Sequence, residues 1–373
     1  MTSDKRQARS QKTGVRSQQP VVANFPPALH RHLKLDTRNL RFRSSLVTGR
    51  LLKGIGIVNI VIGSRGSQLA LWQANWVKEQ LTAAGHEIAI EIIRTTGDKL
   101  QSYPPEHPLP ASIAQSVAEA GTKGLFIKEI EEALLAGKVD LAVHSLKDLP
   151  TILPAGLSLA AVPPREDARD ALISAGGEPF EQLPKGARVG TSSPRREAQL
   201  KQLRPDLEPI ALRGNLDTRL RKLERGDCAA LVLAAAGLHR LGLRERITAY
   251  FSFDQICPAV GQGALAIEIR QGHAELARTV TTLDDRSTYL AVCAERALLR
   301  CLGGGCQVPI AAHATFEDAQ LHLRGVVASL DGSRLIRASA VGSQEDPESL
   351  GAAVAEDLLE KGADEILKPL TWR

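Results

Sequence analysis

One short pattern occurs twice in this chain: an apolar run enters a turn of small residues, and a helix with arginine near its start follows. The first copy is the run Ile57–Ile62 with the turn GSRGS, after which Ser67 is a plausible N-cap. The second is Arg188–Val189 with the turn GTSSPRR. Short apolar runs that alternate with helices are typical of parallel α/β sheets. The repeat therefore predicts two similar α/β domains that face each other across a cleft.

The remaining patterns divide the chain further. We expect a disordered leader or extension at 1–56, an α/β domain at 57–163 with a return segment at 264–281, a second α/β domain at 169–257, and a small α+β domain at 286–373. The return segment is predicted from the strand-like run Ala264–Ile269. Proline-rich residues 152–185 are expected to form a crossover into the second α/β region, and Leu100–Gly121 a loop.

Charge and composition exclude several classes of function. Residues 1–58 hold twelve Lys/Arg and two acids, which leaves 35 of the 47 basic and 40 of the 42 acidic residues for the remainder. The remainder is mildly acidic, and aromatic residues make up only 3% of the chain, so we expect no general binding of nucleic acid. The sequence contains no run of about 18 apolar residues, the length that a membrane-spanning helix needs, so we expect no membrane span. Five cysteines do not suggest a disulfide framework.

Polar residues follow an apolar run in the stretch VDLAVHSLKDLPT at Val139–Thr151. If the run is a buried strand, its polar residues lie just past the carboxyl end, where open α/β sheets bind ligands. These residues are His144, Ser145, Lys147 and Asp148. On this stretch alone, a surface ion pair between Lys147 and Asp148 is the simpler explanation.

Arginine is concentrated at turns. The positions are Arg65, Arg195, Arg196, Arg213, Arg219 and Arg240. A cation at a helix N-terminus opposes the helix dipole, so local stability does not explain the first three. Guanidinium groups beside Ser/Thr hydroxyls and backbone N–H groups bind carboxylates well. We interpret the set as a site for a ligand with several negative groups; the alternative is that each arginine lies on a solvated helix face.

A second unusual feature is the segment GGGCQVP, which places Cys306 after three glycines. An open, flexible thiol of this kind is a candidate nucleophile or attachment point. Cys301 lies five residues earlier, but no further Cys or His is near enough to complete a zinc site, so we expect no metal. A Cys–His hydrolase that uses His144 and Cys306 is a weaker hypothesis, because nothing in the sequence brings the two together.

Ten motifs, in order over roughly residues 58–370, resemble the porphobilinogen deaminase (hydroxymethylbilane synthase) family: GSRGSQLALWQ, TTGDK, KGLFIKEIE, DLAVHSLKDLPT, REDARDAL, VGTSSPRR, LRGNLDTRLRKL, LAAAGLHRLG, PAVGQGA and GGGCQVPI. The resemblance implies two α/β domains like the lobes of solute-binding proteins, facing a cleft, plus a small α+β C-terminal domain. It implies a transferase of tetrapyrrole (haem or chlorophyll) biosynthesis that condenses four porphobilinogen molecules head to tail, with loss of ammonia, to hydroxymethylbilane. It also implies a monomer that hands its product to uroporphyrinogen-III synthase.

The resemblance implies roles for individual residues. Cys306 matches the cysteine that carries a dipyrromethane cofactor through a thioether, and Asp148 matches the catalytic aspartate. The matching substrate- and cofactor-binding positions are Arg65, Ser67, Lys123, Ser145, Lys147, Thr191, Ser192, Ser193, Arg195, Arg196, Arg213, Arg219 and Arg240. Each pyrrole unit bears an acetate and a propionate, so a growing chain is a polyanion that needs many cations. Loss of ammonia creates a cationic azafulvene that one carboxylate can stabilise.

Two questions stay open on the sequence. A non-enzymatic solute-binding module for an acidic ligand would also suit two lobes and an arginine-lined cleft, although Cys306 and the missing export signal count against it. The leader at 1–56 is rich in Arg and Ser and poor in acids, like a transit peptide, which would place the protein in a plastid. Because GGGCQVPI resembles bacterial members more than plant ones, we expect a cytoplasmic protein.

Overall fold

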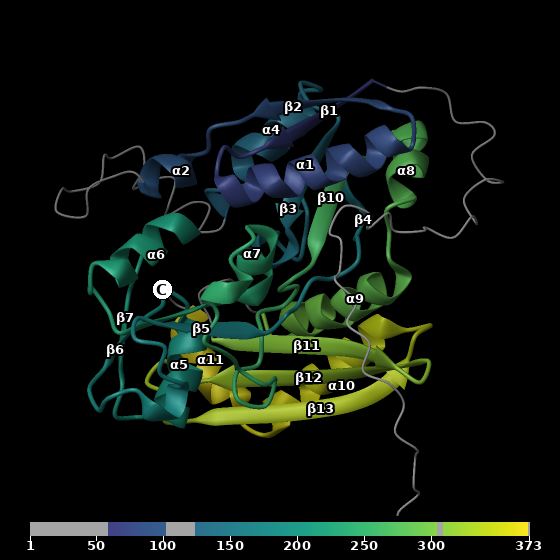
Figure 1. The fold of residues 1–373 in the computed structure, drawn as a ribbon. Helices are drawn as coiled ribbons and strands as arrows, with labels where there is room; N and C mark the ends of the chain where they lie inside the picture. Colours follow the sequence, from purple (N-terminus) through teal and green to yellow (C-terminus); the bar gives the residue numbers. More distant parts are fainter. Residues whose placement is uncertain (1–58, 102–123, 304–308, 372–373) are drawn as a thin grey trace, which may run out of the picture. The chain divides into compact units, whose positions relative to one another are not determined.

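The computed structural model describes residues 59–101, 124–303 and 309–371. The expected leader at 1–56, most of the expected loop Leu100–Gly121, and both Lys123 and Cys306 lie outside these residues. The described chain builds three sheets, each with its own helices (Figure 1). Among the described helices, none combines the length and the apolar character that a membrane span requires.

The first sheet has five strands in the order β2-β1-β3-β10-β4. β1 (Asn59–Ser64) pairs in parallel with β2 (Glu87–Ile92) and with β3 (Leu141–Ser145). β10 (Leu265–Arg270) lies antiparallel between β3 and β4 (Leu157–Ala161). The predicted return strand is therefore confirmed, and it makes the sheet mixed instead of wholly parallel.

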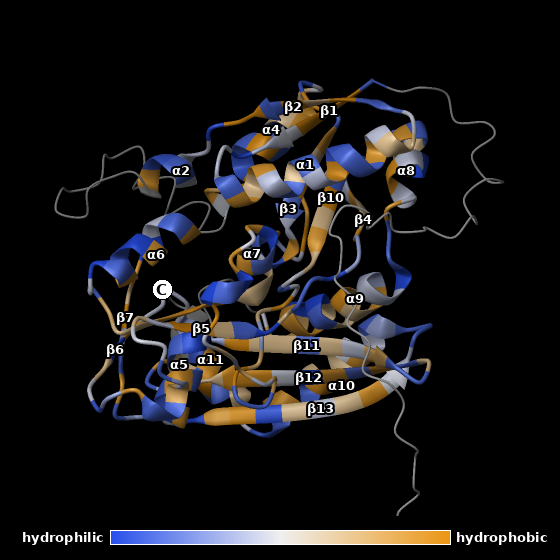
Figure 2. Ribbon diagram, in the orientation of Figure 1, coloured by the Kyte–Doolittle hydropathy of each residue, from blue (hydrophilic) through white to orange (hydrophobic). Residues whose placement is uncertain are grey.

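Helix α1 (Gln68–Ala83) covers this first sheet and begins where the sequence predicts. The hydroxyl of Ser67 accepts a hydrogen bond from the Ala70 N–H at 3.3 Å, which satisfies one of the free donors of the first turn. Its buried residues pack on the strands, with Val77 and Leu81 in one cluster with Ile60 and Ile62 of β1. Figure 2 shows both hydrophilic and hydrophobic residues along the length of α1, as expected for a helix that covers a sheet with one face and exposes the other. The other helices of this part are α2 (Thr96–Gln101), α4 (Lys128–Leu135) and α8 (Ala274–Thr281).

The second sheet repeats the arrangement, with strand order β7-β6-β8-β5-β9. Its strands are β5 (Asp170–Ser174), β6 (Arg188–Gly190), β7 (Glu208–Ile210), β8 (Ala230–Ala234) and β9 (Ala249–Tyr250). β6 runs parallel to β7 and β8, whereas β5 runs antiparallel to β8. The turn after β6 leads into α5 (Pro194–Leu203), which Ser193 caps; α6 (Leu216–Glu224) and α7 (Ala235–Arg240) follow. The predicted repeat of strand, turn and helix is present beside both sheets, with Arg65 in the turn before α1 and Arg195 and Arg196 in the first turn of α5.

The third sheet is antiparallel and contains β11 (Ile310–Glu317), β12 (Gln320–Ala328) and β13 (Leu335–Ser343). Its main helices are α9 (Arg286–Cys301) and α10 (Pro347–Glu360), followed by α11 (Ala363–Thr371). Leu298 of α9, Val354 of α10 and Val327 of β12 share one buried cluster, so both helices pack on this sheet. The predicted fold class, two α/β domains and a small α+β domain, is confirmed. The division at 163/169, 257/264 and 281/286 stays a prediction.

The expected crossover at 152–185 leads from the first sheet to the second; it contains β4 and β5, two five-residue strands between prolines that are too short to show a period. One local prediction is wrong. β3 continues through His144 to Ser145, which pairs with Leu265 of β10, so only Lys147 and Asp148 lie in the turn beyond the strand. A polar residue can stay in a buried strand when a neighbouring strand supplies its partner, and His144 has such a partner in Glu268.

Candidate active site

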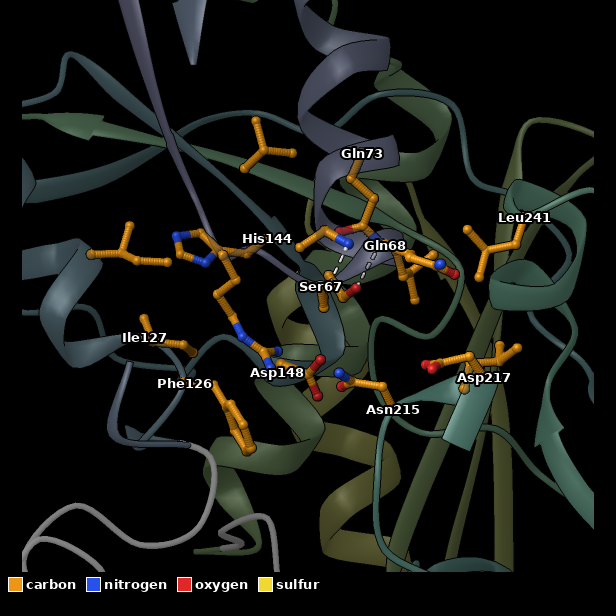
Figure 3. A pocket seen from close by; sticks show the side chains of 17 residues that line it. Ser67, Gln68, Gln73, Phe126, Ile127, His144, Asp148, Asn215, Asp217 and Leu241 are labelled. Carbon is orange, nitrogen blue, oxygen red and sulfur yellow. Dashed lines mark hydrogen bonds between the residues drawn. The ribbon is translucent and has the colours of Figure 1, made fainter. Parts of the chain in front are cut away.

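A cavity of about 130 Å³ lies at the carboxyl end of β3 and the start of α1. Figure 3 shows Asp148 between Phe126 and Asn215, with Ser67 above it in the view and Asp217 to one side. Four predicted site residues line it: Arg65, Ser67, Ser145 and Asp148. Asn215 and Asp217, at the start of α6, line it too, so both α/β parts contribute to the wall.

Asp148 is the last residue of a single 3-10 turn, Leu146–Asp148, that directly follows β3. Leu146 is 1% exposed, and its N–H donates to the Ala264 carbonyl at 3.0 Å. The Leu149 N–H closes the turn on the Leu146 carbonyl at 3.0 Å. Apolar anchors on either side therefore fix the backbone while the Asp148 carboxylate stays half-buried at the cavity.

Arg65 is oriented by an internal carboxylate. Its Nε and Nη2 donate to Asp98 Oδ1 at 3.0 and 2.5 Å, and its guanidinium lies 4.2 Å from the centre of the Phe126 ring. Burial alone would raise the pKa of Asp98, but the hydrogen bonds and charge of Arg65 lower it overall. The pair holds the guanidinium in place on the cavity wall, and a ligand does not have to order it.

Arg195 and Arg196 share one buried aspartate. Arg195 Nη1 donates to Asp170 Oδ2 at 2.7 Å, and Arg196 donates through Nε and Nη2 to Asp170 Oδ1 at 2.9 and 2.7 Å. Burial opposes ionisation of Asp170, yet the two guanidinium groups hold its pKa far below the usual range. Carboxylates distant in the sequence, Asp170 for these two arginines and Asp98 for Arg65, therefore pair with the guanidinium groups that local stability does not explain. The alternative of solvated helix faces is wrong for Arg195, Arg196 and Arg240, which are 5%, 6% and 8% exposed.

Positive charge exceeds negative charge around Asp148. Burial lowers the pKa of Lys147 to about 8; Asp148 opposes this shift, and Arg196 adds to it. Burial, with a smaller effect of Arg196, lowers the pKa of Arg219 to about 10. Arg219 donates Nε–H to the Gly214 carbonyl at 2.9 Å, and no carboxylate of a described residue pairs with it. Mutually repelling buried cations favour a bound anion, so this donor set fits a ligand with carboxylates, as the dipyrromethane cofactor has.

The other predicted residues are either exposed to solvent or bonded to groups of the protein itself. Ser192 and Arg213 are exposed, and Ser193 caps α5 by accepting from the Arg196 N–H at 3.4 Å. Thr191 is buried and accepts from the Ser193 N–H at 3.3 Å. Arg240 donates to the Gly263 carbonyl at 2.7 Å. Neither residue lines the cavity, so this contact fixes the backbone outside it.

Two family models match the chain: "Porphobilinogen deaminase, dipyromethane cofactor binding domain" over residues 60–278, and "Porphobilinogen deaminase, C-terminal domain" over 289–360. The chain belongs to the porphobilinogen deaminase family. A porphobilinogen deaminase of Syntrophotalea carbinolica is 51% identical over 83% of this chain and 95% of the relative. One of Desulforudis audaxviator is 52% identical over 83% of this chain and 96% of the relative.

Solved structures similar to the chain include solute-binding proteins. An arginine-specific periplasmic binding protein of Salmonella typhimurium matches with 14% identity and a TM-score of 0.35, over 62% of this chain and 93% of that one. A sulfonate-binding protein of Methylobacillus flagellatus matches with 12% identity and a TM-score of 0.32, over 66% and 68%.

The sequence did not indicate the contacts of several further residues in and near this site. Gln73 of α1 donates to the Ser145 hydroxyl at 2.9 Å and lines the cavity. His144, which we expected beyond the end of β3 and considered as a hydrolase partner of Cys306, has its Nε2 3.1 Å from Glu268 Oε2. Burial and the nearby charge of Glu268 raise the pKa of Glu131 to about 7.

Proposed function

We propose that the protein condenses its substrate at the cavity beside Asp148, with Asp148 as the catalytic carboxylate. The chain is an enzyme of tetrapyrrole biosynthesis that condenses porphobilinogen to hydroxymethylbilane and has a dipyrromethane cofactor. The observation that carries the assignment is the position of Asp148, at the end of β3 in the cavity and next to an excess of cations. Asp217 also lines the cavity, but it is 46% exposed and pairs with Arg221 at 3.3 Å.

Asp148 would have two roles, to stabilise positive charge on the substrate and to accept a proton. When ammonia leaves porphobilinogen, positive charge develops on the substrate, and a carboxylate held on the cavity wall offsets it. The same carboxylate can hold the proton that leaves the pyrrole carbon as the new bond forms. The neighbouring Lys147 is mostly protonated at neutral pH, because its lowered pKa is still about 8, so it adds a positive charge next to Asp148.

Cations near Asp148 would hold the acetate and propionate groups of substrate and cofactor. We assign this role to Arg65, Lys147, Arg195, Arg196, Arg213 and Arg219, with polar contacts from Ser67, Lys123, Ser145, Thr191, Ser192 and Ser193. The cofactor, when attached to Cys306, supplies the pyrrole end to which units are added. Arg195 and Arg196 would keep one net positive charge after pairing with Asp170, which suits a ligand carboxylate.

The attachment is tested by intact mass. Protein purified from cells that make porphobilinogen is expected to be heavier than its chain by one covalent dipyrrole, and Cys306→Ala is expected to have the bare mass. A solute-binding module would show the bare mass for both proteins. A bare mass for the wild type would overturn the covalent attachment.

We also propose that the protein acts in the cytoplasm as a monomer and hands the linear product to uroporphyrinogen-III synthase. Bacterial relatives at about half identity support the cytoplasmic location over the plastid alternative. Fractionation of a tagged full-length protein in its own host tests the location, and recovery in plastids would reverse it. Deletion of 1–56 is expected to leave activity unchanged.

A further inference from the structure

Arg296 belongs to α9, yet its side chain reaches the backbone directly after Asp148. Its Nη2 donates to the Pro150 carbonyl at 2.7 Å, and its Nη1 to the Leu149 carbonyl at a longer 3.5 Å. Arg296 is 7% exposed. Burying a guanidinium is costly unless its donors are used, so this contact is a built feature of the interior.

Helix α9 makes further contacts that hold the turn Leu146–Asp148. Val292 of α9 packs in one buried cluster with Leu146 and Leu149, the residues that flank Lys147 and Asp148. Glu295, which is 0% exposed, accepts from the Gly261 N–H at 2.7 Å.

Gly261 transmits this contact to the turn by close packing. It has φ +72°, and a Cβ added there would lie 2.1 Å from Leu146 Cδ2 and 3.2 Å from the Lys147 nitrogen. Side chains at neighbouring positions of α9 therefore hold the turn: Arg296 through its carbonyls, and Glu295 through the glycine packed against it.

We propose that Arg296 is a positioning residue that fixes the backbone after β3 and thereby sets where the Asp148 carboxylate meets the substrate. The inference rests on the proposed catalytic role of Asp148. A planar guanidinium with two N–H groups suits two successive carbonyls, whereas a lysine offers a point charge without that geometry. The helix that carries Arg296 also leads to Cys306, ten residues later in the sequence, so one element would link the attachment segment to the catalytic turn.

The test compares Arg296→Gln, Arg296→Lys, Arg300→Gln and Asp148→Asn in full-length, cofactor-loaded protein. Arg300 is the matched control, because it lies one turn further along α9 and pairs with the exposed Glu348 at 3.0 Å. Intact mass checks loading, and thermal melting checks folding. The readouts are kcat, KM, and amide hydrogen exchange of a peptide that spans Leu146–Thr151.

Displacement of a catalytic group by about 1 Å costs up to about a hundredfold in rate, so we expect Arg296→Gln to lower kcat by about tenfold to a hundredfold. KM should change by less than about threefold, because the cavity cations are untouched. Exchange at Leu149, whose N–H closes the turn, should be faster. Arg296→Lys should fall between Arg296→Gln and the wild type, and Arg300→Gln should match the wild type in all three readouts.

The outcomes separate this inference from the proposed function. Near-normal turnover by Asp148→Asn would overturn the role of Asp148 itself. If Asp148→Asn is impaired but Arg296→Gln and Arg296→Lys turn over normally, Arg296 does not position the carboxylate. A lower melting temperature with normal kcat and unchanged exchange would make Arg296 a structural residue only. If Arg296→Gln does not fold, Arg296→Lys decides, and normal kcat in that variant overturns the proposal.

Discussion

Asp170 is the most informative residue to perturb, because two buried arginines depend on it. Its Oδ1 accepts from Arg196 Nε, Arg196 Nη2 and Gln262 Nε2, and its Oδ2 accepts from Arg195 Nη1. In Asp170→Asn, whichever oxygen becomes an NH₂ group would face at least one guanidinium donor. The variant therefore loses a charge and also places two donors opposite each other.

The expected loss is large. Asp170 is 0% exposed, and breaking a buried ion pair by removing one partner typically costs about 3–5 kcal/mol. We expect Asp170→Asn to lower the free energy of unfolding by about that amount in urea denaturation at neutral pH. Asp254→Asn is the control, because Asp254 is 90% exposed and pairs with Arg324 at 2.8 Å; its loss should stay under about 1 kcal/mol.

Anions give a second readout of the same variant. Without Asp170, the Arg195–Arg196 group has two uncompensated positive charges, so sulfate should restore part of the stability of Asp170→Asn. The comparison is with sodium chloride at equal ionic strength, and Asp254→Asn should show no such difference. A loss below about 1 kcal/mol for Asp170→Asn, or no preference for sulfate, would refute the view that this buried pairing leaves positive charge for an anion.

Three further predictions concern single residues. Asp148→Asn should keep the loaded mass but lower product formation about a hundredfold, which is the usual contribution of one catalytic group; unchanged product formation would contradict it. Because the folded-state pKa of Glu131 is raised from 4.5 to about 7, its contribution to stability is fully present below about pH 4.5 and is lost as the pH rises through about 7. Glu131→Gln should flatten this dependence in denaturation at several pH values, and exposed Glu132→Gln should not; equal curves for wild type and Glu131→Gln would reject the assignment. Asp285 caps α9 by accepting from the Thr288 N–H at 2.8 Å, so Asp285→Ala should lower the unfolding free energy by about 1 kcal/mol, and an unchanged denaturation midpoint would speak against the cap.

Features of local origin could be predicted from the sequence. The cap at Ser67 follows from a hydroxyl at the end of a glycine-rich turn, and the return strand from an apolar run after a Gly-Gln-Gly turn. β4 and β5 could not be foreseen, because five residues between prolines show no period. Their strand character comes from the neighbours with which they pair.

Side-chain pairs between residues far apart in the sequence could not be predicted either. Asp170 and Arg195 are 25 residues apart, and His144 and Glu268 are 124 apart. The sequence indicated that Arg195 needed an anion but could not say that a buried aspartate supplies one. The hydropathy of β3 alone likewise predicts that the strand stops before His144, because it carries no information about the carboxylate of Glu268 on the adjacent strand.

The placement of β10 has a consequence for synthesis of the protein on the ribosome. β10 pairs with both β3 and β4, but Leu265 is translated more than a hundred residues after Ala161. At roughly 5–20 residues per second, the strands of the first sheet wait about 5–20 s with the hydrogen-bonding edge of β3 unpaired. The second sheet is made of one continuous segment, Asp170–Tyr250, and can be complete before the first. During this interval the nascent chain therefore exposes a strand edge whose unpaired N–H and C=O groups can pair with another chain. A chaperone or the ribosome surface could cover this edge until β10 is made.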